Sequence, residues 1–391
     1  MAARQILTGT TAHRNYRLAG WGMVLVGLVV VAMAYSDVGQ ITLFDNDYNL
    51  SLIRLNKAIA FIVAILGLQL IVGFTGQIAL GQSFFFGLGA YATAYLVQDQ
   101  NWSYLSTLLV VIPLCFLVGM LLGLPALRIE GLYLALVTLA MAAIFPSIIR
   151  LDQLFDITNG SNGKIVDANI RAPGWLPLDG LAGMLQAIPL VGQYFGDGDL
   201  SQREADRVWK YVLLVLVAAV AFWLVSNLIA SRPGRAMRAI RDNEASAAVS
   251  GINLAYTKTM AFGLGSALGG VGGTLYVMEL GIASPDDFTQ LLAINLIVGL
   301  VIGGVGSLSG AVVGGLVIAL VPDWASSTQS VGGLPERWLQ GPTGTLFLGI
   351  LLILLTFFLP GGIVAGLRRV RARFVVVVPR PPLSEVSNPQ G

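Results

Sequence analysis

Long apolar stretches alternate with short polar turns along almost the whole chain. A helix needs roughly 17 to 25 mostly apolar residues to cross about 30 Å of hydrocarbon. Ten stretches of about that length lie at residues 18–35, 57–73, 78–97, 104–127, 131–150, 208–229, 259–281, 289–304, 307–322 and 344–360. Because some are separated only by glycine-rich turns, two of the pairs fit broken helices as well as full crossings. The pattern predicts an all-α polytopic membrane protein with about ten transmembrane helices, including broken helices.

The composition agrees with a membrane location. Hydrophobic residues make up 55% of the 391 residues and charged residues 11%, whereas about a quarter of the residues in soluble domains are charged. The net charge of +2 gives no reason to expect a nucleic-acid partner. A single histidine, His13, and a single cysteine, Cys115, cannot build a disulfide framework, a His/Cys metal site or a catalytic couple within the membrane. We expect neither a catalytic residue nor a metal site.

The positions of the charges predict the orientation. More than half of the 23 basic residues lie in three segments, at the start of the chain, in residues 230–258 and after residue 365. An even number of crossings places all three on one side, and an excess of Lys and Arg marks cytoplasmic segments. We therefore expect both termini in the cytoplasm of a multi-pass plasma-membrane protein. The first stretch also fits a cleavable signal peptide, with AMA at 32–34.

These segments divide the chain into three parts. Residues 1–17 form a predicted cytoplasmic N-terminal segment, residues 18–365 a transmembrane domain, and residues 366–391 a cytoplasmic tail that we expect to grade into disorder. Within the transmembrane domain, residues 151–207 are predicted to be an extracytoplasmic insertion and residues 230–258 a cytoplasmic loop.

The predicted spans carry neutral polar residues and almost no ionisable ones. Carriers driven by protons or sodium commonly keep ionisable side chains within the membrane, whereas Lys57 and Glu279 fall at the ends of spans. Uphill transport would then need free energy from another polypeptide. The predicted translocation pathway consists of Thr75, Gln77, Gln82, Ser83, Phe84, Thr138 and Asn295. Alternatively, the glycines between residues 73 and 91 only let helices approach closely.

The polar stretch RPGRAMRAIRDNEASAAVSGIN, residues 232–253, interrupts this apolar pattern. Read as one helix, it carries a stripe of Met237, Ile240, Glu244, Ala247 or Ala248, and Gly251, flanked by Arg235, Arg238, Arg241 and Asp242. The spacing predicts ion pairs of Arg238 with Asp242 and of Arg241 with Glu244. The stripe favours docking in a groove of a partner. The alternative is a solvated loop whose arginines only set the topology.

Glycines recur every fourth residue in two later stretches, as in close helix contacts within membranes. The predicted helix-packing residues are Gly265, Gly269, Gly273, Gly306, Gly310 and Gly314. The pairs Gly73 with Gly76 and Gly303 with Gly306 hint at a weak repeat in which each half has one broken helix. TNGSNG, residues 158–163, is either an ordinary turn or part of an outer gate formed by Thr158, Asn159 and Asn162.

Four stretches resemble the permease subunits of branched-chain amino-acid ABC transporters. They are VGFTGQIALGQSFFFGLGAYATAYL (72–96), LRIEGLYLALVTLAMAAIF (127–145), the stretch 231–276 that begins SRPGRAMRAIRDNEAS, and LLAINLIVGLVIGGVGSLSGAVVGGL (291–316). The resemblance covers roughly residues 55–365 and implies an ABC importer permease architecture. Many relatives carry His at the position of Gln82. The importer loop of the family usually starts Glu-Ala-Ala and has a later glycine. Here Glu244 and Ala245 match this start, Ser246 replaces the second alanine, and the glycine, Gly251, comes one residue late.

The resemblance implies that residues 230–258 hold a coupling helix that inserts into a cleft of a cytoplasmic ATPase. The residues expected to contact the ATPase are Arg235, Met237, Arg238, Ile240, Arg241, Asp242, Glu244, Ala247, Ala248 and Gly251. The implied partners are a homologous second permease, two ATPase subunits, an extracytoplasmic solute-binding protein and the lipid bilayer. No cofactor is expected in this chain, since ATP and Mg would be bound by the ATPases.

The expected function is therefore that of a transport subunit and not of an enzyme. The family implies branched-chain amino acids as the solute. Urea or short amides are an alternative, since an uncharged passage can admit either. A stand-alone secondary carrier and a passive channel remain as further alternatives from a different class.

Overall fold

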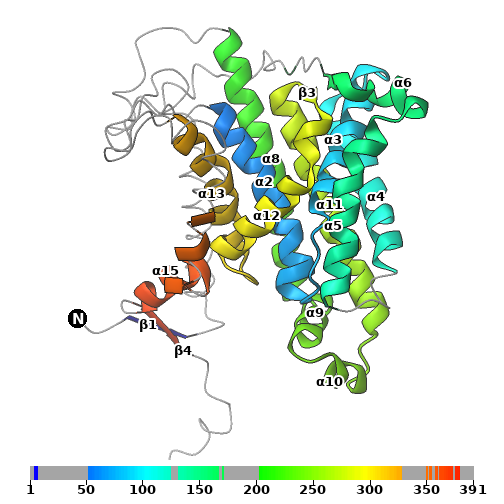
Figure 1. Ribbon diagram of the computed structural model, residues 1–391. Coiled ribbons are helices and arrows are strands. Elements are labelled where there is room, and N and C mark those ends of the chain that lie inside the picture. Colours follow the sequence, from blue (N-terminus) through cyan, green and yellow to red (C-terminus); the bar gives the residue numbers. More distant parts are fainter. Residues whose placement is uncertain are drawn as a thin grey trace, which may run out of the picture.

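The computed structural model describes residues 4–7, 52–124, 131–166, 170, 202–327, 349–350, 352–354, 357–359, 361–372 and 375–378 (Figure 1). Most described residues are helical. The predicted spans at 18–35 and, for the most part, at 344–360 lie outside the described residues, as do residues 171–201 of the predicted insertion.

Long helices make up the body of the protein. They are α2 (Leu52–Leu68), α3 (Gln82–Gln98), α4 (Tyr104–Gly123), α5 (Leu132–Ile149), α8 (Gln202–Ala230), α11 (Leu254–Leu280), α12 (Gln290–Gly303) and α13 (Leu308–Ser327). A π-helix, η1 (Gln69–Phe74), continues α2. At one end of the body lie α9 (Arg232–Asp242) and α10 (Glu244–Val249). At the other end lie η3 (Asp152–Leu154), α6 (Phe155–Thr158), η4 (Gly160–Asn162), β2 (Lys164–Ile165), β3 (Ile282–Ala283) and η6 (Pro285–Phe288).

Within the described residues, four helices are long and apolar enough to cross a membrane, at Ile53–Phe74, Tyr104–Gly123, Trp209–Ala230 and Leu254–Leu280. A fifth span results if the bent pair Tyr133–Ile149 and Asp152–Asn162, which meets at 71°, counts as one. These helices match five of the predicted stretches. The total of about ten crossings remains a prediction.

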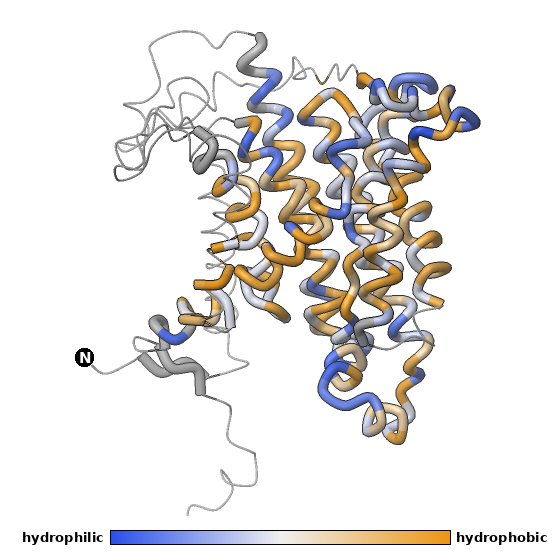
Figure 2. Tube along the Cα trace, in the orientation of Figure 1, coloured by the Kyte–Doolittle hydropathy of each residue, from blue (hydrophilic) through white to orange (hydrophobic). Residues whose placement is uncertain are grey.

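Helices α2 and α11 form the centre of the bundle. Helix α11 packs against α2, α3 and α4, and 83% of the Ile53–Phe74 window and 78% of the α11 window are buried, compared with 22% for α4 and α8. The exposed side chains of α4 and α8 are nevertheless apolar, as Leu109, Leu121 and Trp223 show. In Figure 2 the middle of the bundle is mostly hydrophobic and the polar residues gather at its two ends. This distribution is the one expected when lipid surrounds the outer helices.

Glycines bring α11 against its neighbours. A Cβ atom at Gly269 would lie 2.7 Å from Nε2 of Gln82, and one at Gly265 would lie 2.5 Å from Cγ1 of Ile71. A Cβ atom at Gly273 would overlap the backbone of α3. Between α12 and α13, a Cβ atom at Gly310 would lie 2.5 Å from the carbonyl oxygen of Gly304, and one at Gly314 would overlap the backbone of α12. The backbones therefore approach closely where the sequence repeats glycine every fourth residue.

Two of the predicted crossings are interrupted. The stretch predicted as one helix at 78–97 begins as a helix only at Gln82, because residues 76–81 form neither helix nor strand. Helix α12 has 14 residues, which at 1.5 Å per residue reach about 21 Å, less than the hydrocarbon thickness of about 30 Å. The pair α12 and α13 therefore fits the broken-helix alternative better than two full crossings.

The expectation of an all-α chain needs correction at a few short segments, whereas residues 379–391, where the tail is expected to grade into disorder, lie outside the described residues. The tail contains α15 (Gly362–Ala372) and β4 (Val375–Val378), and β4 pairs in parallel with β1 (Arg4–Leu7). A second sheet consists of β2 and β3 in antiparallel pairing. The parallel pairing places segments from the two ends of the chain side by side (Figure 1).

We predict that Gly273→Ala lowers the stability of the purified protein by about 1 to 3 kcal/mol, because the new methyl group forces α11 away from α3. The midpoint of denaturation in detergent measures the effect. Gly349→Ala is the matched control, since no atom lies within 4 Å of a Cβ atom built there. An unchanged midpoint for Gly273→Ala would show that the α11 to α3 contact tolerates a side chain.

Candidate functional site

Two helix breaks lie close together near the end of the bundle that carries α9 and α10. The first break follows η1, where Gly76 has φ of 74°, and the second separates α12 from α13, where Gly304 and Gly306 have φ of 117° and 78°. Positive φ favours glycine because it has no Cβ atom. The two breaks touch, since a Cβ atom at Gly73 would lie 2.9 Å from the backbone nitrogen of Gly306.

Gln69 joins the two breaks through its side-chain amide. Its Oε1 accepts a hydrogen bond from the backbone nitrogen of Gly306 at 2.7 Å, and its Nε2 donates to the carbonyl oxygen of Gly304 at 3.0 Å. The side chain is fully buried. The amide thus replaces the helical partners that both backbone groups lose at the break. In the sequence, Gln69 is a neutral polar residue within an apolar stretch. Its bonds to Gly304 and Gly306 were therefore not predicted.

The stretch 232–253 is not one helix as predicted. Asn243 has an extended backbone with φ of −162° and separates α9 from α10, and its side chain caps α10 by accepting from the nitrogen of Ser246 at 2.8 Å. The predicted ion pairs are also replaced by other contacts. Arg238 donates to the carbonyl oxygen of Ile229 at 2.7 Å, and Glu244 pairs with Lys258 at 2.5 Å. The kink at Asn243 turns α10 away from α9, which removes the single-helix spacing of Arg241 and Glu244 but leaves that of Arg238 and Asp242.

The apolar stripe predicted to dock on a partner faces the protein itself. Met237, Ile240 and Ala247 are buried, and Met237 belongs to the hydrophobic core. Met237 and Ile240 are therefore not available to an ATPase in this structure. The remaining residues expected to contact the ATPase are exposed, namely Arg235, Arg238, Arg241, Asp242, Glu244, Ala248 and Gly251. The most exposed apolar side chain of the segment, Val249 at 91%, was not singled out from the sequence.

Two links connect α9 and α10 to the first break. Arg241 donates from Nη1 to the carbonyl oxygen of Gly73. Glu244 pairs with Lys258 at the start of α11, and the carbonyl oxygen of Lys258 accepts from Nε2 of Gln77 at 3.4 Å. The exposed segment is thus attached to the interrupted span by side chains from both of its helices.

The other residues of the predicted pathway surround the first break and α3. Thr75 donates to the carbonyl oxygen of Ile71 at 2.5 Å, and Thr138 on α5 accepts from the nitrogen of Leu80 at 2.8 Å. Gln82 donates to the carbonyl oxygens of Ala64 and Gly265, at 3.0 and 3.1 Å.

Ser83 and Phe84 follow on α3. Ser83 is buried, and its hydroxyl has no partner within the described structure. Phe84 makes an edge contact with Phe145. Asn295 lies half-buried on α12, apart from this group in sequence. Most of these polar groups therefore bind backbone atoms of the protein.

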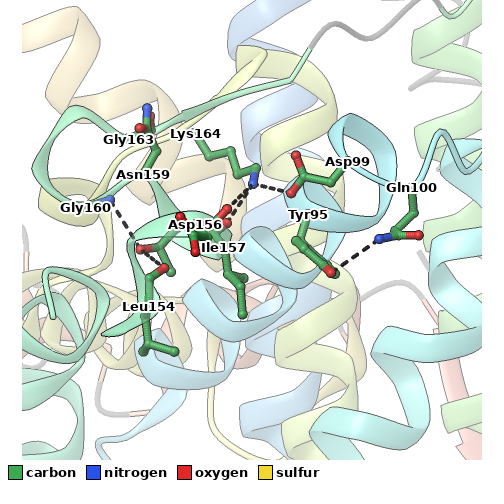
Figure 3. Close-up of polar contacts among 11 residues, drawn as sticks. Tyr95, Asp99, Gln100, Leu154, Asp156, Ile157, Asn159, Gly160, Gly163 and Lys164 are labelled. Atoms are coloured by element: carbon green, nitrogen blue, oxygen red, sulfur yellow. Dashed lines mark hydrogen bonds and ion pairs between the residues drawn. The ribbon is translucent and has the colours of Figure 1, made fainter. Parts of the chain in front are cut away.

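The opposite end of the bundle is fastened by a buried lysine that the sequence did not reveal (Figure 3). Lys164 on β2, 6% exposed, pairs through Nζ with Asp99 at the end of α3 and donates to the carbonyl oxygen of Ile157 at 2.8 Å. Its ammonium also lies 5.3 Å from the ring centre of Tyr95, within the range of a cation–π contact. One ammonium group therefore holds the segment after α5 against α3.

The three residues of the predicted outer gate lie in this fastened segment. Thr158 is buried and donates to the carbonyl oxygen of Ile149 at 2.7 Å, which bends the chain back onto α5. Asn159 has φ of 60°, and its side chain donates to the carbonyl oxygen of Gly163 at 2.9 Å. Asn162 is exposed. Only Asn162 therefore offers its side chain freely to a partner in this arrangement.

Charges sit at the ends of the bundle. In the described helices, the ionisable residues nearest the middle are Lys57 and Lys210 near the starts of α2 and α8, and Lys258 and Glu279 near the two ends of α11. Near the Lys164 end, burial raises the pKa of Asp287, the charge of Asp286 raises it further, and Lys57 opposes this shift. In the described part of the chain, no three His, Cys, Asp or Glu residues form a group able to hold a metal ion.

We predict that Lys164→Met lowers the stability of the protein by about 1 to 3 kcal/mol, since Asp99 and the carbonyl oxygens of Asp156 and Ile157 lose their buried donor. Arg150→Met is the control, because the Arg150 to Asp286 pair is exposed and such pairs contribute about 0 to 1 kcal/mol. Limited proteolysis between residues 150 and 170, together with the denaturation midpoint, measures the difference. Equal effects of the two substitutions would contradict a fastening role for Lys164.

Comparison with known proteins adds an independent line of observation. LivM, the high-affinity branched-chain amino acid transport system permease protein of Escherichia coli K12, is 30% identical over 251 residues, which are 63% of this chain and 57% of LivM. LivM of Salmonella typhimurium is 31% identical over 255 residues, with the same coverage of 63% and 57%. LivH, also named a high-affinity branched-chain amino acid transport system permease protein, of Escherichia coli K12, is 28% identical over 120 residues, or 31% of this chain and 37% of LivH.

The chain therefore spans 57% of the length of its LivM relatives. No solved structure matches it significantly. Residues 50–356 match the family described as the permease component of the branched-chain amino acid transport system. This match covers most of the chain and includes both helix breaks and α9 to α10. The chain belongs to the branched-chain amino acid transport permease family.

Proposed function

We propose that this chain is the transmembrane permease subunit of an ATP-driven importer for branched-chain amino acids. The observation that carries the proposal is the family match over residues 50–356. The relatives LivM and LivH are named as permease proteins of a high-affinity branched-chain amino acid transport system. The chain itself would perform no catalysis.

A homologous second permease would complete the translocation pathway. Two differently named permease proteins, LivM and LivH, come from one organism, and both are similar to this chain. The exposed apolar faces of α4 and α8 offer surface for lipid or for such a neighbour. The solute would pass along the interrupted span beside α5 and α12. The predicted pathway residues are Thr75, Gln77, Gln82, Ser83 and Phe84 of that span, Thr138 of α5 and Asn295 of α12.

The absence of ionisable groups from the middle of the described spans supports an external source of free energy. Two cytoplasmic ATPase subunits, which bind ATP and Mg, would supply it through α9 and α10. The exposed side chain of Val249 is suited to fill an apolar pocket, and Arg235 and Arg238 would meet acidic groups at the rim. This assignment places α9, α10 and both termini in the cytoplasm.

An extracytoplasmic solute-binding protein would then meet the opposite end of the bundle. The segment fastened by Lys164 exposes Asn162 there, while Thr158 and Asn159 keep its backbone folded. We expect this segment to form part of the outer gate.

Deletion of the gene in its native host should abolish high-affinity uptake of radiolabelled leucine and leave uptake of radiolabelled urea unchanged. Restoring the gene on a plasmid should restore leucine uptake. Loss of urea uptake alone would instead assign urea as the solute. Accumulation by the purified chain alone in liposomes, without ATPase subunits, would overturn the proposal in favour of a stand-alone carrier.

We predict that Val249→Asp weakens binding of the ATPase subunits by roughly 30-fold, as expected when a central apolar contact worth about 2 kcal/mol is lost. Co-purification of the ATPases with the tagged chain measures binding. Ile165→Asp at the opposite end of the bundle is the matched control, since Ile165 is also an exposed apolar residue. Undiminished co-purification with Val249→Asp would exclude α10 as the docking surface.

A further inference from the structure

We propose that Arg241 is the positioning residue that ties α9 to both helix breaks, so that a movement of α9 displaces the two breaks together. The inference rests on the proposed function for one point only, that ATPase subunits act on α9 and α10. It differs from the prediction made from the sequence, in which Arg241 contacts the ATPase.

The side chain of Arg241 runs between glycines of the two breaks. A Cβ atom at Gly76 would lie 3.3 Å from Cγ of Arg241, and one at Gly306 would lie 2.5 Å from its Nη1. The same nitrogen donates to the carbonyl oxygen of Gly73. A side chain at Gly306 would occupy the place of the guanidinium group. The path of Arg241 therefore depends on the absence of side chains at the breaks.

One helix end lies at this guanidinium group, because Nη1 of Arg241 donates to the carbonyl oxygen of Gly73 near the end of η1. The η1 extension of α2 ends at Phe74, the residue after Gly73. The last carbonyl groups of a helix lack backbone partners, and the helix dipole places partial negative charge there. A cation at such an end is attracted to it. Arginine suits the position because its five N–H donors can serve several carbonyl oxygens while its charge is permanent.

The two breaks are also bound to one another, so that one attachment point is sufficient to move both. Gln69 holds Gly304 and Gly306 from the first break, through bonds of 3.0 and 2.7 Å. The ion pair of Glu244 with Lys258, whose carbonyl oxygen accepts from Gln77, gives α10 a second attachment to the first break only. Among the described residues of α9 and α10, Arg241 is the one whose side chain reaches both breaks.

Arg238 provides the matched control. It lies one turn before Arg241 on the same helix, and its guanidinium group donates to the carbonyl oxygens of Ile229 and Gly234, at 2.7 and 3.4 Å. These acceptors belong to α8 and α9, so its removal leaves the breaks untouched. Both substitutions, Arg241→Gln and Arg238→Gln, remove one positive charge from the same surface.

The experiment compares the two variants in the complete transporter purified from its native host. Co-purification reports ATPase docking, hydrogen–deuterium exchange of residues 69–82 and 301–310 reports the breaks, and leucine uptake into proteoliposomes reports transport. For Arg241→Gln we expect normal docking, faster exchange at both breaks and a drop in uptake of roughly tenfold or more. Arg241→Lys should recover part of the uptake. Arg238→Gln should leave exchange at both breaks unchanged, and any fall in its uptake should match its fall in bound ATPase, since Arg238 is itself a proposed ATPase contact.

Unchanged exchange at both breaks, a change at only one break, or normal uptake by Arg241→Gln would each overturn the inference while leaving the proposed function in place. A wild-type chain that co-purifies with no ATPase would instead overturn the proposed function. The exchange comparison needs no partner, so it would still decide whether Arg241 ties the two breaks together.

Discussion

Backbone groups released from a helix within a membrane protein must find partners inside the protein, because lipid offers none. This requirement explains the polar residues around the first break better than any single contact with a solute. Thr75 binds the carbonyl oxygen of Ile71, and Thr138 binds the nitrogen of Leu80. Gln69 serves two backbone groups of the second break. An interrupted span is thus stable here because neutral side chains take the place of the missing helical hydrogen bonds.

The same requirement limits which parts of the protein can move independently. Helices α2 and α11 are largely buried, and glycines such as Gly265 and Gly269 let backbone and side chains of neighbouring helices meet with no room for a further methyl group. Packed interfaces of this kind shift as units and do not deform continuously. The breaks combine glycines of positive φ with side-chain hydrogen bonds to the backbone. They are therefore the places where a change in backbone direction costs least.

The sequence predicted the helical class, five of the spans, the glycine stretches and the position of the polar segment, because these depend on local composition and period. It did not predict the kink at Asn243, although asparagine is a preferred N-cap and here caps α10, because the apolar stripe also fits one continuous helix. It also missed Lys164, because the pairing with Asp99 joins residues 65 positions apart in the chain. The role of Gln69 depends on a contact across 235 positions. Contacts of this range follow from packing and not from spacing.

Helix α11 connects the two ends of the bundle in a single piece. Lys258 at its start pairs with Glu244 of α10, and Glu279 near its end accepts from Asn56 at 2.8 Å and lies 3.8 Å from Lys210. Its 27 residues span about 40 Å at 1.5 Å per residue. An ATPase acting on α10, as proposed, would therefore move the far end of the same rigid helix. Arg241 would move the breaks in the same step, so that the breaks and the far end of α11 would change together, because both are attached to α9 and α10.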